Sequence, residues 1–362
     1  MVRIVAVAGG ALAVALLVAG PGRASLFQPD DPMIVTVGTN QLGEPFPPDE
    51  FRRRMGVLGN EADPRLTPDG GPNPDRAKVL ARVKASPPAH TLPADAAAAR
   101  AADMLRLGNT DAGFFVNDAL DLLAPRTRDR SPSYFVHTTL AQLHAARGEW
   151  TEAATYHGAA LIDCEMPAAV KGWTPEQRAW VARLDADVVP HYLRLRKADA
   201  EGRPVVETEE PTPLFPVRFV DDAGVYEPGT LAAAERAKLP ADAVAVVQQL
   251  LLWFPSDTRL YWLLAELYAA EGDLDTAQKI FDECAWSRQF GNRKVFMDHR
   301  TAVTAAAEAK RRAADADAAN AYPVNLRMIL VYFGVVVVVG VLAVARALGK
   351  RGGGGCGTGG CG

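Results

Sequence analysis

Three histidines in this sequence stand where they could act together. His137 and His144 are seven residues apart and so share one face of a helix, while His157 lies on the helix expected after the next turn. Neighbouring imidazoles can hold Zn²⁺ or titrate together near about pH 6. An imidazole is also a flat ring that can replace an aromatic side chain between two helices, and we favour that packing role. A metal-dependent module built on these histidines is the alternative.

Two cysteines near the C-terminus form a second candidate. Cys356 and Cys361 are separated by four residues in a glycine-rich tail, residues 349–362. Their thiols could pair, share a metal ion or carry a lipid, but a zinc site usually needs four ligands. We favour a flexible tail without metal. Cys164 and Cys284 are expected to be buried as small apolar groups, because four scattered cysteines make no disulfide framework.

Other chemistry is not evident in the sequence. It contains no phosphate-binding loop, no zinc-protease helix, no nucleophile elbow and no Cys-x2-Cys pair. The net charge is −4 and charges of both signs are mixed along the chain, so the sequence does not indicate a basic surface for binding nucleic acid. We therefore expect no enzyme activity, no cofactor, no small-molecule substrate and no nucleic-acid partner.

The elements that position these residues follow a helical pattern, which is clearest in residues 258–291. Large apolar side chains recur there at steps of three and four residues, small residues mark a close helix approach, and a glycine marks the turn. They are Tyr261, Leu264, Ala265, Tyr268, Gly272, Ala277, Phe281 and Cys284. The pattern predicts two helices packed as a hairpin.

This stretch resembles a tetratricopeptide repeat, a unit of 34 residues that buries its apolar face only against neighbours. Partial copies precede it. One has its second helix at 243–255 and a shortened first helix at 230–239, one spans 134–167, and the weakest covers 94–125. The resemblance implies an all-α fold, a short interrupted helical superhelix.

In such repeats the first helices line a groove that grips peptides or partner helices. The resemblance implies that a protein or peptide partner binds at the corresponding positions of two units, which are Arg259, Trp262, Glu266, Phe135, Thr138 and Gln142. Tryptophan and arginine often dominate binding energy at interfaces. Contact with a neighbouring repeat or with the linker is the other interpretation of these side chains.

A long helix and a linker separate the two pairs of units. Thr174 and Gln177 form a capping box around Pro175, so a helix begins there, and Pro190 is expected to kink it near residue 189. The following segment is punctuated by prolines, and residues 217–225 could form a small hairpin.

Two apolar segments indicate where in the cell the protein is located. Residues 1–24 have a positive charge, a short apolar run and small residues near Ala24, which is typical of a signal peptide. Residues 328–345 carry no charge, and such a helix is about 27 Å long, which suffices for a transmembrane helix. Arg346, Lys350 and Arg351 follow it, so the tail is expected in the cytoplasm and the body outside. Removal by a surface-sorting protease is a secondary possibility.

The sequence thus predicts a membrane-anchored, non-enzymatic scaffold whose repeats recruit another protein outside the cytoplasm, in the periplasm or at the cell surface. The predicted segments are a signal peptide (1–24), a Pro-rich, loosely ordered arm (25–93), a first helical region (94–200), an extended linker (201–229), a second helical region (230–300), an Ala-rich stalk helix (301–323), a transmembrane helix (326–348) and a Gly/Cys tail (349–362).

Overall fold

The structure is a computed structural model. It describes residues 45–51, 55, 74–107, 114–129, 133–164, 166–168, 174–202, 213–255, 257–287, 290–321 and 326–349. The predicted signal peptide and the two tail cysteines, Cys356 and Cys361, lie outside these residues.

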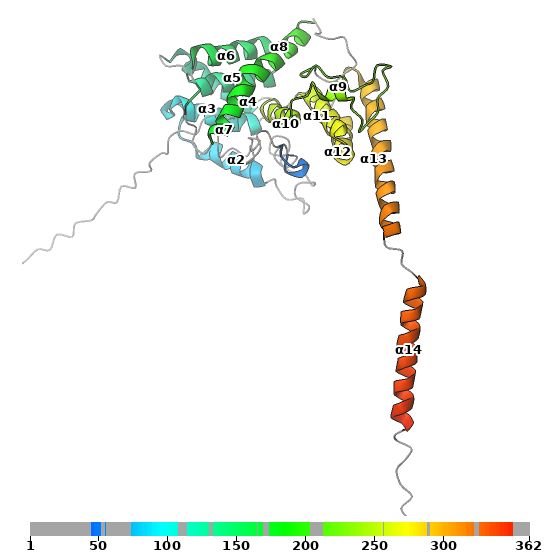
Figure 1. Ribbon diagram of the computed structural model, residues 1–362. Coiled ribbons are helices and arrows are strands. Elements are labelled where there is room, and N and C mark those ends of the chain that lie inside the picture. Colours follow the sequence, from blue (N-terminus) through cyan, green and yellow to red (C-terminus); the bar gives the residue numbers. More distant parts are fainter. Residues whose placement is uncertain are drawn as a thin grey trace, which may run out of the picture. The chain divides into compact units, whose positions relative to one another are not determined.

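The described part of the chain is helical and contains no strand, which confirms the all-α class (Figure 1). The α-helices in chain order are α2 (Pro74–Ala85), α3 (Ala94–Leu107), α4 (Phe114–Leu123), α5 (Tyr134–Ala146), α6 (Trp150–Asp163), α7 (Pro175–Arg183), α8 (Val189–Ala200), α9 (Ala233–Arg236), α10 (Ala243–Trp253), α11 (Thr258–Glu271), α12 (Leu274–Ser287), α13 (Arg293–Ala321) and α14 (Leu326–Gly349). The described residues also include two 3₁₀ turns, η1 (Ala89–Thr91) and η2 (Ala124–Arg128), one π turn, η3 (Leu184–Val188), and a helical turn at 48–51.

Three helical hairpins lie where the repeat pattern predicts them: α3 with α4, α5 with α6, and α11 with α12. Small side chains at the helix crossings explain the close packing. Ala153, Ala160, Ala265 and Ala277 are at most 1 % exposed. Because alanine adds little volume at these crossings, each pair of helices can approach closely.

Glycine turns close two of the hairpins. Gly148 has φ 75° between α5 and α6, and Gly272 has φ 81° after α11. This left-handed backbone is strained for residues with a Cβ, so glycine is the natural residue at the end of the first helix. Both turns coincide with the glycine position of the predicted repeats.

The first helical region begins earlier than the sequence suggests. Helix α2 packs against α3, its Val79 is 2 % exposed, and Arg76 donates a hydrogen bond to the carbonyl of Leu107 at 3.2 Å. The predicted arm ends at residue 93, but the structure places α2 in the folded body. Asn73 as a cap and Pro74 at the first helical position predict a helix from Pro74 to about Ala85, and α2 confirms it. What the sequence did not indicate is that this helix packs against the body.

The long central helix begins at the predicted capping box and changes its winding before Pro190. Thr174 accepts a hydrogen bond from Gln177 N–H at 3.2 Å and donates its own N–H to the Gln177 side chain at 2.9 Å. A π turn then connects α7 to α8, and the N–H of Val189 bonds to the carbonyl of Leu184. Proline cannot donate the next helical hydrogen bond, so the predicted kink takes the form of a π turn.

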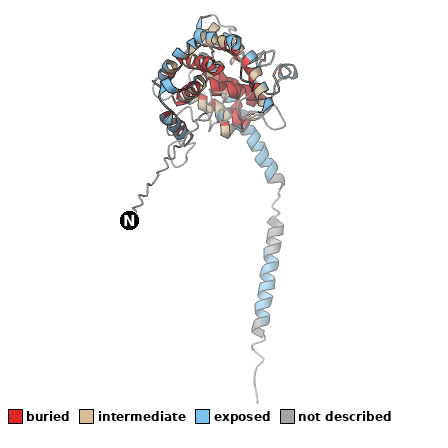
Figure 2. Ribbon diagram, turned by 90° about the vertical axis from the view of Figure 1, so that its left-hand side faces the viewer, coloured by how far each residue is buried: buried red, intermediate tan, exposed pale blue. Residues whose placement is uncertain are grey.

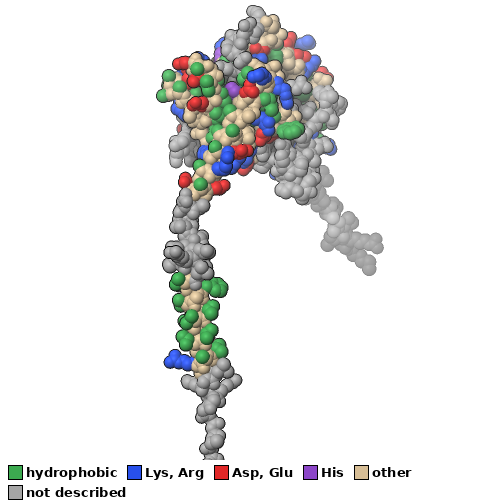
Figure 3. Space-filling model, turned by 90° about the vertical axis from the view of Figure 1, so that its right-hand side faces the viewer, with side chains coloured by type: hydrophobic (Ala, Val, Ile, Leu, Met, Phe, Trp, Pro, Cys, Tyr) green, Lys and Arg blue, Asp and Glu red, His purple; other side chains and the backbone are tan. Residues whose placement is uncertain are grey.

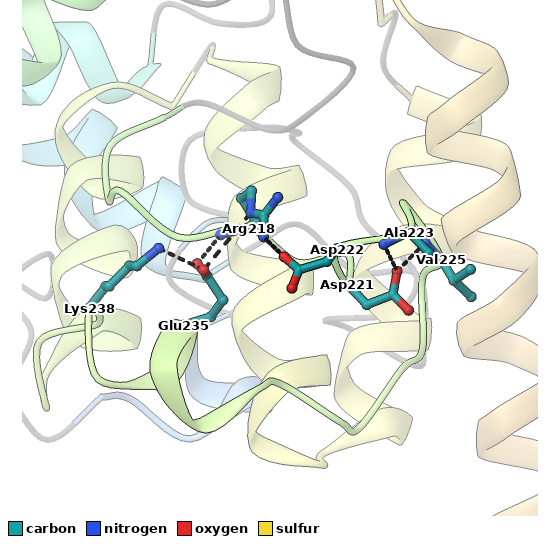
Figure 4. Close-up of polar contacts among 7 residues, drawn as sticks. All are labelled: Arg218, Asp221, Asp222, Ala223, Val225, Glu235 and Lys238. Atoms are coloured by element: carbon teal, nitrogen blue, oxygen red, sulfur yellow. Dashed lines mark hydrogen bonds and ion pairs between the residues drawn. The ribbon is translucent and has the colours of Figure 1, made fainter.

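The described part of the linker is held by side-chain contacts and forms no hairpin of strands (Figure 4). The carboxylate of Asp221 accepts hydrogen bonds from the N–H groups of Ala223 and Val225 at 2.9 and 2.7 Å. Glu235 on α9 accepts from the N–H of Arg218 at 2.8 Å and pairs with Lys238 at 2.6 Å. The N–H of Asp221 also bonds to the carbonyl of Val225 at 2.9 Å. The predicted hairpin is therefore a tight turn without strands, held by the Asp221 carboxylate and by backbone hydrogen bonds.

Buried residues gather in the middle of the first unit (Figure 2), and α10 and α11 are among the most buried helices. All residues of α10 are buried, and α11 is buried from Trp262 to Ala270. A helix that is buried on every side must be covered by several elements. Those elements determine what the last predicted repeat can bind.

Contacts divide the chain into a unit that ends at Thr304 and a unit that begins at Ala305. In the first unit, Phe296 and Val303 of α13 are fully buried, so the helix begins as part of the body, before the predicted stalk. The second unit holds the rest of α13 and α14.

Helix α14 forms over the predicted span and exposes many apolar side chains (Figure 3). The five valines 335–339 are 54–62 % exposed. Among the described residues, however, no helix combines the length and the apolar character required to cross a membrane.

Candidate functional site

Helix α11 presents two separate faces. Tyr261 and Tyr268 lie on one face, and Trp262 and Glu266 lie roughly 130° around the helix from them. Asp257 begins the helix by accepting a hydrogen bond from the N–H of Arg259 at 2.9 Å. Different parts of the chain cover the two faces.

The face with Glu266 is the one where the resemblance places a partner, and the chain itself covers it. Glu266 is 1 % exposed. Its carboxylate accepts hydrogen bonds from Trp262 Nε1 at 2.7 Å and from the hydroxyl of Tyr226 at 2.6 Å, and His299 Nδ1 lies 2.7 Å away. The rings of Tyr226 and His299 stack with centroids 3.7 Å apart. The linker and α13 thus occupy this face.

The six predicted partner-binding residues have different exposures. Arg259 is exposed and pairs with Asp199 on α8 at 2.6 Å. The other five are at most 6 % exposed: Trp262, Glu266, Phe135, Thr138 and Gln142. In α5, Thr138 donates to the carbonyl of Phe135 at 3.3 Å. The structure does not unite the six into a surface, because packing within the chain buries five of them.

The three histidines do not converge. His144 Nδ1 lies 2.6 Å from Glu149, and its ring stacks on Tyr156. His157 Nε2 lies 2.9 Å from Asp185, while His137 Nδ1 lies 3.4 Å from the sulfur of Cys164. Within the described residues, no group of three or more potential ligands is placed to hold a metal ion.

The pKa shifts of His137 and Cys164 both favour the neutral forms of the side chains. Burial lowers the pKa of His137, although Asp163 opposes this shift. Burial and, to a lesser extent, Asp163 raise the pKa of the Cys164 thiol. An activated cysteine needs the reverse directions, a lowered thiol pKa beside a protonated imidazole. The pair is therefore arranged as a neutral thiol and a neutral ring.

A buried carboxylate in the π turn is a site that the sequence did not reveal. Asp185 is 1 % exposed, accepts a hydrogen bond from the hydroxyl of Tyr134 at 2.6 Å, and lies beside His157. Burial and the neighbouring carboxylate raise the pKa of Tyr134 well above its ordinary value. The signal in the sequence was Pro190, which predicted a kink in the helix. It did not indicate which side chain of the kink is buried.

The other face of α11 meets a segment from the beginning of the described chain. Gln248 of α10 is fully buried, and its carboxamide forms two hydrogen bonds with the backbone of Phe46. It accepts from the N–H at 2.8 Å and donates to the carbonyl at 3.1 Å. The same amide group also donates to the hydroxyl of Tyr268 at 3.0 Å. Helix α10 thus holds the segment 45–51 through the backbone of Phe46.

Two aromatic anchors accompany these hydrogen bonds. Phe46 is 3 % exposed and Phe51 is 6 % exposed. Between them, the N–H of Phe51 bonds to the carbonyl of Pro47 at 2.9 Å, which closes one helical turn. The segment is therefore irregular at Phe46 and helical at residues 48–51, and Phe51 is the second aromatic ring that is buried.

A pocket of about 60 Å³ lies where this segment meets α11 and α12. Its lining is mainly apolar, with a lysine and two acidic residues: Pro48, Asp49, Phe51, Met55, Tyr261, Leu264, Tyr268, Thr276, Lys279, Ile280, Glu283 and Cys284. Sequence reasoning missed this site. The available signal was the pair Gln248 and Gln249 in the middle of an otherwise apolar helix.

The chain matches no protein-family model, no curated protein and no solved structure. The tetratricopeptide pattern is therefore a resemblance carried by helix positions and small residues. The two covered faces of α11 are the features of the structure that bear on function.

Proposed function

We propose that this protein is a non-enzymatic interaction scaffold that binds a segment of a partner protein through its helical hairpins. One observation carries the proposal. The α10–α12 region holds residues 45–51, about 200 residues away in sequence, through the backbone of Phe46 and two aromatic side chains. A surface that binds one segment through the main chain of a residue has the chemistry to bind another.

The arrangement of the hairpins supports a repeat-like scaffold. We propose that α3–α6 and α9–α12 form the two halves of a short, tetratricopeptide-like array, interrupted by α7, α8 and the linker. The buried small residues and the turn glycines of these hairpins support this assignment. Arrays of this kind are typical of protein-binding proteins.

We further propose that α14 anchors the scaffold in a membrane, with the body outside the cytoplasm. The uncharged run 328–345 and the exposed valines 335–339 support this, because water-exposed apolar side chains of this number are unfavourable. The basic residues that follow the run favour a cytoplasmic tail. An N-terminal signal peptide belongs to the same proposal.

Photo-crosslinking in the native cell tests the scaffold role. Lys279→p-benzoylphenylalanine places a crosslinker at an exposed position of the pocket lining, and Glu152→p-benzoylphenylalanine places a control on the exposed face of α6. We expect a discrete adduct with a second protein from position 279 and not from position 152. Because Pro48, Asp49 and Phe51 line the same pocket, intrachain crosslinks are expected as well. Failure to obtain any adduct with a second protein from position 279 would contradict the scaffold role.

A further inference from the structure

We propose that the surface holding residues 45–51 is an exchangeable peptide site. Its partner is a segment of another protein that carries two aromatic anchors around a proline-containing turn, and the chain's own segment competes with it. This inference rests on the proposed scaffold function and names its ligand. The site consists of Gln248, Tyr268 and the pocket on α11 and α12; we call it the Gln248 seat.

The Gln248 seat recognises main chain. Both hydrogen bonds from Gln248 go to backbone atoms of Phe46, so they are available to any residue other than proline at that position. The contact with the Tyr268 hydroxyl at 3.0 Å holds the carboxamide in place. A fully buried amide fixed in this way is a preformed site for one N–H and one carbonyl of a peptide.

Specificity comes from the side chains that flank this contact. Phe46 and Phe51 are the buried anchors, whereas Pro47 and Asp49 between them are exposed. The prolines restrict the backbone before binding, which reduces the entropy lost on ordering the segment. Lys279 and Glu283 of α12 line the same pocket, so the seat presents both charges beside the aromatic anchors. The anchors and the prolines therefore set the specificity.

The chain's own segment fits the seat incompletely. The pocket of about 60 Å³ remains between Pro48 and Phe51 on one side and Leu264 and Ile280 on the other. Unfilled apolar space forfeits dispersion contacts. A partner with a larger apolar side chain at the position of Pro48 fills this space and competes more effectively than the native segment.

The attachment of the segment also favours exchange. The segment contacts the body through two aromatic anchors, Phe46 and Phe51. The other face of α11 is covered by the linker and α13, whose Tyr226 and His299 both contact Glu266. A tethered segment has a high effective concentration and so weakens the apparent affinity for any competitor. Weakening the segment must therefore strengthen binding of a free peptide.

The test uses the full chain in detergent micelles and a fluorescent peptide of residues 43–56. The double variant Phe46→Ala/Phe51→Ala disables the chain's own segment and leaves the seat intact. We expect this variant to bind the peptide at least tenfold more tightly than the wild type by fluorescence anisotropy. Adding Gln248→Leu to the double variant is expected to abolish the gain, and a peptide in which both phenylalanines are alanine is expected not to bind.

Thiol labelling of Cys284, read by mass spectrometry, gives a second measurement that does not depend on the peptide label. Cys284 lines the pocket and is 1 % exposed. We expect faster labelling in the double variant and protection when the peptide is added. Circular dichroism verifies that the variants are folded.

Equal binding by the wild type and the folded double variant, with Cys284 unchanged, would overturn the peptide site. Filling of the seat by the segment of a second copy, seen as a concentration-dependent dimer with intermolecular crosslinks from position 279, would also overturn it. If the peptide fails to bind but the adduct from position 279 persists in cells, the scaffold function stands and only this inference fails. If both are absent, the scaffold function fails as well.

Discussion

At the scale of residues, the body is joined by tyrosines that donate to buried carboxylates from distant segments. The pairs are Tyr134 with Asp185, Tyr192 with Asp257, and Tyr226 with Glu266, at 2.6, 2.8 and 2.6 Å. Burial, and then the adjacent carboxylate, raises the pKa of each of these tyrosines. Such pairs connect helices that are not consecutive, so each contributes to the specificity of the packing.

Removal of one carboxylate tests this role. In Glu266→Ala, the indole of Trp262 and the hydroxyl of Tyr226 lose a common acceptor inside the core. Since each stranded donor costs about 1–3 kcal/mol, we expect a loss of about 3 kcal/mol in the free energy of unfolding. Glu152→Ala, at an exposed position, is expected to change it by less than about 0.5 kcal/mol. Urea denaturation of both variants provides the comparison, and equal midpoints would refute the role.

The lowered pKa of His137 predicts a pH dependence of stability. The unfolded chain takes up this proton near about pH 6.5, but the folded chain resists it because the ring is buried. The unfolded state then binds more protons, so stability falls as the pH drops below about 6.5 toward the folded pKa. We expect His137→Phe, which keeps a ring in place, to lose less stability than the wild type between pH 7.5 and pH 5.5. Identical losses in urea titrations would show that His137 does not contribute.

At the scale of elements, the π turn η3 buries one of its two carboxylates and leaves the other exposed to solvent. Asp185 is buried against Tyr134 and His157, whereas Asp187 in the same turn is exposed. These two aspartates form a matched pair of variants. We expect Asp185→Ala to lower the free energy of unfolding by about 3 kcal/mol and Asp187→Ala by less than about 0.5 kcal/mol. If the two variants have the same denaturation midpoint, the inward turn of Asp185 is not what stabilises this element.

Helix α14 carries a prediction about location. If it anchors the chain as proposed, a charge in its middle is costly, by about 2.5–3.5 kcal/mol for an aspartate at the centre of a membrane helix. We expect the wild type to stay with membranes after carbonate extraction and Val337→Asp/Val338→Asp to be released. Ala314→Asp on the exposed part of α13 is the control and is expected to stay bound. Release of the wild type would exclude the anchor.

At the scale of the whole molecule, the positions of the helices were predictable because the local signals were strong. The capping box at Thr174, the turn glycines Gly148 and Gly272, and the small residues at the helix crossings each depend on a few neighbouring residues. The shortened first helix of the third unit was also expected, and α9 is only four residues long. These features depend on local backbone geometry, which sequence patterns describe well.

The candidate site was not predictable for a physical reason. The Gln248 seat joins residues about 200 positions apart, and the Glu266 cluster combines side chains from the linker, α11 and α13. Repeat positions suggested that Trp262 and Glu266 face a partner, but they could not show that Tyr226 and His299 cover them. Long-range coverage of a helix leaves no periodic trace in the sequence of that helix.

Hydrogen–deuterium exchange on the full chain tests most directly whether the helical array holds a peptide segment by its backbone. The amides of residues 46 and 51 are hydrogen-bonded in the structure, the first to Gln248. We predict protection of the segment 45–51 in the wild type and its loss in Gln248→Leu, with the exchange of α3 to α6 unchanged in both. Exchange of this segment in the wild type at the rate of an unstructured peptide would contradict the claim.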